Sequence, residues 1–110
     1  MLFRSAGLKD DLLEVQRRLA KENPDDVTTR LAIAARYEAD GRLPEQIGTY
    51  EEITRARGLP PPAMAEHRMK LASLYERNGQ RNEALAQYRE VLKGDPKHSA
   101  AAEAVKRLGG

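Results

Sequence analysis

The sequence predicts an all-α fold in which antiparallel helix pairs stack into a solenoid of about six helices. Residues 37–41 (YEADG) and residues 75–79 (YERNG) carry the same pattern 38 residues apart. The register also pairs Ile33-Ala34 with Leu71-Ala72, and Tyr50 with Tyr88. Apolar residues recur at helical spacing nearly throughout, and no long stretch alternates as a strand would. Stacked repeats of this kind present extended binding surfaces.

The composition is typical of one helical domain spanning residues 1–110. A net charge of +2, dispersed along the chain, argues against nucleic-acid binding, which needs clustered basic residues. No apolar run reaches the roughly 18 residues of a membrane span. The absence of cysteine excludes disulfides and fits a reducing compartment. A cytoplasmic location is the default expectation, and a periplasmic domain or a piece of a longer array stays open.

The first helix is expected at about residues 8–21. It ends before Pro24, because the residue preceding a proline avoids the helical region. Asp25 and Asp26 then supply cap chemistry for a helix at residues 27–39.

Gly41 is expected to end that helix in a left-handed conformation. Pro44 suits the first turn of the next helix, predicted at about residues 44–57. The segment of residues 58–62 (GLPPP) is the strongest break in the chain, and a fourth helix is expected at about residues 63–78.

Gly79 marks the end of the fourth helix. Asn82 is expected to cap a fifth helix that runs to Lys93. Residues 94–96 (GDP) break the chain again, before a last helix at about residues 98–108.

These residues resemble the tetratricopeptide repeat, a helix pair with apolar, small, aromatic, glycine and proline residues at set offsets. The second unit matches at Leu71, Ala72, Tyr75, Gly79, Ala84, Tyr88, Val91, Leu92 and Pro96. The first unit matches at Ile33, Ala34, Tyr37, Gly41, Tyr50 and Ile53. It departs at Gln46, where a small residue is usual, and at Gly58, where proline is usual.

The resemblance divides the chain into a half repeat (8–22), two repeats (27–60 and 63–96) and a half repeat or capping helix (97–108). The two units lie 38 residues apart instead of the family's 34. We expect the extra residues around Leu59–Pro62, where they would lengthen the link between the repeats.

The resemblance implies a non-catalytic protein–protein interaction module that captures a peptide or helix in the groove formed by the first helix of each repeat. By register, the groove residues would be Thr28, Leu31, Ala35, Glu38, Glu66, Met69, Ser73, Glu76 and Arg77. Leu31 and Met69 would supply apolar contacts. Of the Lys/Asn/Arg clamp with which one sub-class holds chaperone tails, only Lys70 has a match, so that role is not expected. These positions would alternatively be plain exposed helix surface.

The alternative function is self-assembly, as a homo-oligomer or a structural scaffold. A half repeat at the N-terminus would leave an apolar face of its helix without a partner. The residues proposed for self-association are Leu8, Leu12, Val15 and Leu19. Leu2 and Phe3 folding back over this face is the competing interpretation.

Catalytic chemistry is not indicated. His67 and His98 lie far apart in the sequence, and there is no cysteine with which to complete a metal site. No phosphate-binding glycine loop or nucleophile motif is present. We therefore expect no enzyme activity, no metal and no cofactor, with a protein or peptide as the partner.

Overall fold

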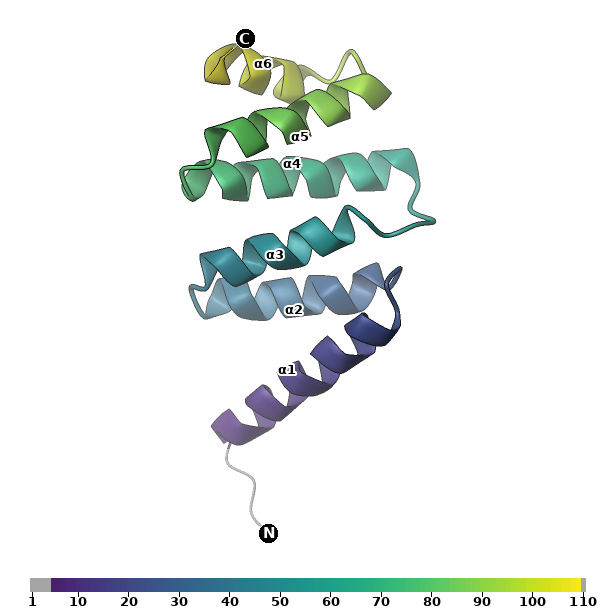
Figure 1. The fold of residues 1–110 in the computed structure, drawn as a ribbon, viewed down its shortest axis with the longest axis vertical. Helices are drawn as coiled ribbons and strands as arrows, with labels where there is room; N and C mark the ends of the chain where they lie inside the picture. Colours follow the sequence, from purple (N-terminus) through teal and green to yellow (C-terminus); the bar gives the residue numbers. More distant parts are fainter. Residues whose placement is uncertain (1–4, 110) are drawn as a thin grey trace. The chain divides into compact units, whose positions relative to one another are not determined.

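The computed structural model describes residues 5–109, and these residues form helices and connecting turns without a strand. Figure 1 shows the helices in chain order. They are α1 (Ser5–Glu22), α2 (Val27–Ala39), α3 (Leu43–Ile53), α4 (Pro61–Arg77), α5 (Arg81–Gly94) and α6 (Ser99–Leu108). The predicted all-helical fold is confirmed.

The chain divides into two compact units, Met1–Ala56 and Arg57–Gly110, which we call unit 1 and unit 2. In unit 1, α2 packs against both α1 and α3. In unit 2, α5 packs against both α4 and α6. The stacking of the units as a solenoid stays a prediction.

A left-handed glycine ends the first helix of each central pair. Gly41 has a φ of 70° and Gly79 a φ of 76°. After each glycine a backbone N–H bonds back to a tyrosine carbonyl, from Arg42 to Tyr37 at 2.9 Å and from Gln80 to Tyr75 at 2.8 Å. These bonds satisfy helix-terminal carbonyls that lack partners within the helix. The predicted glycine turns are confirmed.

Small residues and tyrosines form the contact between the paired helices. Ala34, Ala72 and Ala84 are buried, as a close approach of the helices requires. Tyr37 and Tyr88 are also buried and fill the spaces beside them. Burying a large apolar side chain is worth about 1.5–3 kcal/mol, so these interfaces are the main source of stability within each unit.

Two predicted helix ends were wrong. α3 ends at Ile53 and not near residue 57; the Thr54 hydroxyl donates to the Glu51 carbonyl at 2.7 Å, just where the helix stops. α5 begins at Arg81 after Gln80, so Asn82 lies inside the helix and does not cap it. The turn at Gly79 leads directly into α5 and leaves no room for a separate cap.

The four extra residues of the second repeat add a turn to α4. This helix has 17 residues, whereas α2 has 13, and both end in the same repeat register. Pro60 occupies the N-cap position, and Pro61 and Pro62 begin the helix. Proline suits this turn because its missing N–H would have no helical partner there. The link between the repeats is longer, as predicted, but because α3 ends early; Pro61 and Pro62, which were predicted to lie in the link, belong to α4.

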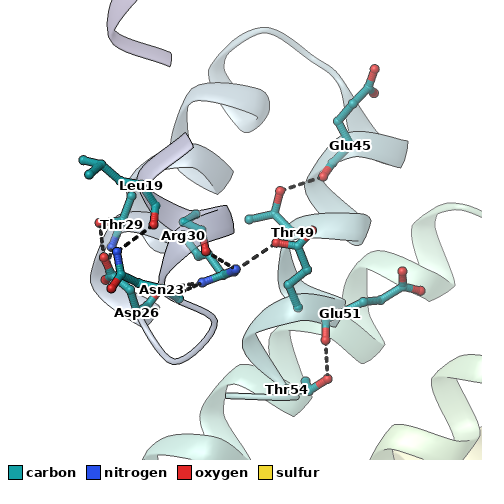
Figure 2. A network of polar contacts seen from close by, with 11 residues as sticks. Leu19, Asn23, Asp26, Thr29, Arg30, Glu45, Thr49, Glu51 and Thr54 are labelled. Atoms are coloured by element: carbon teal, nitrogen blue, oxygen red, sulfur yellow. Dashed lines mark hydrogen bonds and ion pairs between the residues drawn. The ribbon is translucent and has the colours of Figure 1, made fainter. Parts of the chain in front are cut away.

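A buried arginine joins the helices of unit 1 (Figure 2). Arg30 on α2 is 5% exposed. Its guanidinium donates to the carbonyls of Ala20 (2.7 Å), Asn23 (2.9 Å) and Asp26 (3.1 Å). Its Nε donates to Glu52 on α3 at 2.9 Å. One side chain therefore connects the end of α1, the following loop and α3.

The loop before α2 is closed by the predicted aspartate cap. The Asp26 carboxylate accepts from the Thr29 backbone N–H at 3.0 Å and from the Thr29 hydroxyl at 2.6 Å. The hydroxyl bond, followed by the backbone bond, lowers the pKa of Asp26. The cap fixes the loop whose carbonyls Arg30 binds, so the two features support each other.

Replacing Arg30 with methionine should destabilise unit 1 by about 3 kcal/mol, because it removes the hydrogen bonds of the buried guanidinium to three main-chain carbonyls and to Glu52. Arg68→Met is the matched control, since Arg68 occupies the same repeat position and its hydrogen bond goes to a side chain, Gln87. Urea unfolding followed by circular dichroism measures both effects. Equal losses for the two variants would contradict this role of Arg30.

Two glycines should respond to alanine in opposite directions. A Cβ added at Gly48, inside α3, would meet no heavy atom within 4 Å, so no close helix approach requires this glycine. Gly48→Ala should stabilise the protein by about 1 kcal/mol through helix propensity. Gly41→Ala should destabilise it by about 1–2 kcal/mol, because alanine is strained at positive φ. Thermal unfolding of both variants tests the pair.

Candidate functional site

Unit 2 contains a groove of about 720 Å³ between the first turns of α4, the end of α5 and the start of α6. We call it the unit 2 groove. Its apolar lining includes Pro61, Met64, Met69 and Val91. The size is within the range of about 300–1,000 Å³ typical of ligand pockets.

The added turn of α4 builds one wall of this groove. Pro61, Pro62 and Met64 all belong to the extra turn, and all three line the groove. Val91 on α5 is buried and forms part of the groove lining from the opposite helix. The sequence insertion therefore forms part of the groove wall in addition to lengthening a helix.

Polar groups lie among the apolar walls. Arg68 Nη1 donates to Gln87 Oε1 at 3.0 Å. Lys93 donates to Glu90 Oε1 at 2.9 Å, and this bond is the main reason that the pKa of Glu90 is lowered; the Arg68 charge also contributes. His98 Nδ1 accepts from the Ala101 N–H at 3.1 Å and so caps α6. The groove thus presents a guanidinium beside a carboxylate.

The repeat register relates this groove to the Arg30 network of unit 1. Arg68 follows Arg30 by 38 residues, and Glu90 follows Glu52 by the same interval. In unit 1, the arginine is paired with the glutamate and also binds main-chain carbonyls at a helix end. In unit 2, the corresponding arginine and glutamate both line an open groove.

The predicted groove residues of unit 1 share one face of α2. Thr28, Ala35 and Glu38 are exposed, and Leu31 is half-buried. Gln46 Nε2 approaches Glu38 Oε1 at 3.5 Å, a long contact across to α3. The face is accessible along its length.

The predicted residues of unit 2 fall into three groups. Glu66 and Met69 line the unit 2 groove. Ser73 and Arg77 are exposed farther along α4 and do not line it, whereas Glu76 makes contacts within the chain. The other groove residues were not predicted; they include Pro61, Met64, Arg68, Glu90 and His98. Arg68 and Glu90 follow Arg30 and Glu52 by the repeat interval of 38 residues, and this recurrence is the signal that could have identified them.

Glu76 fastens α6 to the helix pair of unit 2. Arg107 on α6 donates to both carboxylate oxygens of Glu76, at 2.6 and 3.2 Å. The hydroxyl of the buried Tyr88 donates to the same carboxylate. Arg107 is the main reason that the pKa of Glu76 is lowered. Binding a ligand through Glu76 would require breaking this network.

The predicted self-association residues lie together on an exposed face of α1. Leu8, Leu12, Val15 and Leu19 are 52%, 58%, 51% and 45% exposed. We call them the α1 stripe. A different face of α1 packs on α2, where Ala20 joins the core and Leu13 packs against it. Leu2 and Phe3, the competing cover, lie outside the described residues.

Comparison with protein-family models and with curated proteins gives no match. Within residues 5–109, no helix has the length and apolar character to cross a membrane. In the same part of the chain, no group of three or more His, Cys, Asp or Glu side chains is placed to hold a metal ion.

Tyr88 should ionise well above the usual range of a tyrosine. Burial, followed by its hydrogen bond to Glu76, raises its pKa to about 12. An unfolded tyrosine ionises near pH 10. The raised pKa of Tyr88 therefore contributes folding stability that is fully present below pH 10 and is lost as the pH rises toward about 12. Alkaline titration of phenolate absorbance measures this. Tyr88→Phe should remove the transition near pH 12, and Glu76→Gln should move it to lower pH; an unchanged titration in Glu76→Gln would contradict the assignment.

Proposed function

We propose that the protein is a non-catalytic protein–protein interaction module, and that unit 2 captures a peptide or helix of its partner in the groove described above. The observation that carries the proposal is the combination of an apolar wall with an arginine in the register of Arg30. Arg30 holds the end of a packed helix in unit 1. The resemblance to tetratricopeptide repeats supports the same class of function.

Apolar contact supplies the binding energy in this proposal. Met64 and Met69 are unbranched and adapt to differently shaped partner side chains. With Pro61 and Val91 they offer a continuous apolar wall. An amphipathic helix that lays its apolar face in such a groove is a recurring mode of recognition.

Arg68 sets the orientation of the bound segment. The last carbonyls of a helix have no intrahelical donor, so a guanidinium is a suitable partner for them. Arg30 binds the carbonyls of Ala20 and Asn23 at the end of α1 in this way. In this proposal Arg68 receives the C-terminal turn of a partner helix, while Glu90 balances its charge.

The polar groups of the groove suit binding better than proton transfer. Glu90 is paired with Lys93, and His98 uses Nδ1 to cap α6. Each group therefore has a structural partner.

A displayed library of short amphipathic peptides, selected on the full chain, tests the proposal. Peptides that bind should lose about tenfold or more in affinity for Met69→Glu, because the change places a charge in the apolar wall. Ser73→Glu is the matched control: it introduces the same charge one turn farther along α4, outside the groove lining.

Arg68→Met should weaken binding and should also reduce the preference for peptides whose helical end enters the groove. Calorimetric titration of the selected peptides measures both effects. The proposal is contradicted when the selected peptides bind Met69→Glu as tightly as the unaltered protein, or when Ser73→Glu is the more damaging change.

A further inference from the structure

The α1 stripe has the spacing of a helix–helix seam. Its members, Leu8, Leu12, Val15 and Leu19, follow one another at intervals of four, three and four residues. This is the alternation of the a and d positions in a heptad. Each side chain is about half exposed, so the described part of unit 1 leaves the seam uncovered.

The stripe is separate from the face by which α1 packs on α2. At about 100° of rotation per residue, the stripe lies roughly 120° around the helix from Leu13 and Ala20. A second helix can therefore occupy the stripe without displacing α2.

We infer that the α1 stripe pairs with the α1 stripe of a second copy of this chain, in antiparallel orientation. The spacing is symmetric about the midpoint between Leu12 and Val15. Antiparallel pairing therefore places Leu8 against Leu19 of the second copy, and Leu12 against Val15 of the second copy. Both pairs would be buried in the interface, and the two-fold symmetry forms each of them twice.

Charge complementarity favours this occupant and this orientation. Asp11 and Arg18 are exposed and flank the stripe on the same side, seven residues apart. In the antiparallel arrangement Asp11 faces Arg18 of the second copy, and symmetry repeats the pair. Parallel pairing would instead set Asp11 against Gln16, which is half-buried and carries no charge. Complementary flanking charges are what set the orientation of coiled-coil helices.

The association should depend on concentration. The seam covers two heptads, fewer than the roughly three to four heptads of a self-sufficient coiled coil. Sedimentation equilibrium of the full chain over a dilution series should show a monomer–dimer equilibrium. Leu12→Glu should give a monomer with unchanged helicity, because this side chain contributes little to the core of unit 1.

A charge exchange tests the orientation without altering any apolar residue. In the Asp11→Arg dimer, each facing pair would consist of two arginines, and their repulsion should weaken the dimer about tenfold or more. Arg18→Asp should weaken its dimer by a similar factor, because each facing pair would then consist of two aspartates. An equimolar mixture of the two variants should form a heterodimer about as stable as the dimer of the unaltered protein, because both ion pairs are regained.

Three results would overturn the inference. The first is a monomer at every concentration, which would leave the stripe to another segment or to another protein. The second is a dimer that Leu12→Glu does not weaken, since it would use a different surface. The third is a dimer whose two charge variants show no preference for each other, since its helices would not be antiparallel in this register.

Discussion

The burial of the Arg30 guanidinium is the constraint on which the structure of unit 1 depends. A charge removed from water is costly unless every donor finds a partner. Here the partners are main-chain carbonyls at the end of α1 and in the loop, together with the Glu52 carboxylate. Because those carbonyls have fixed positions, the arginine determines where α1 ends relative to α2. The Asp26 cap and the burial of Ala20 are consistent with that position.

The arginine at the same repeat position in unit 2 has different surroundings. Arg68 occupies the equivalent repeat position on α4, but α4 has an additional turn that α2 lacks. That turn brings Pro61 and Met64 to the wall of a groove that Arg68 and Glu90 also line. One repeated sequence pattern thus gives a closed, structural arginine in one unit and an accessible arginine in the other. This difference is the reason for assigning binding to unit 2.

Sequence reasoning predicted the helices whose ends carry specific chemistry. α2 begins after the Asp26 cap and ends before Gly41, as its residues indicated. α3 has no glycine or proline at its end, and local bonding around Thr54 was not visible in the periodicity. The prolines at the start of α4 were interpreted as a break, although proline also suits a first helical turn. Propensity alone does not distinguish these two uses.

The candidate site was predicted only in part, and the reason is physical. Met69 was identifiable because an apolar residue stood where solvent was expected. Arg68 and Glu90 were missed because charged residues on a helix are usually solvated, and spacing does not reveal partners on another helix. Glu76 was assigned to the ligand for the same reason, whereas its carboxylate is held by Arg107 and Tyr88.

The carbonyl contacts of Arg30 also define the smallest autonomous fragment of unit 1. A helix pair cut out as α2 and α3 would keep its glycine turn and its small-residue contact. It would lose the carbonyls of Ala20 and Asn23, and the Arg30 guanidinium would then lack these hydrogen-bond partners. The indivisible module of this half is therefore three helices, one more than the repeat unit that the sequence pattern marks.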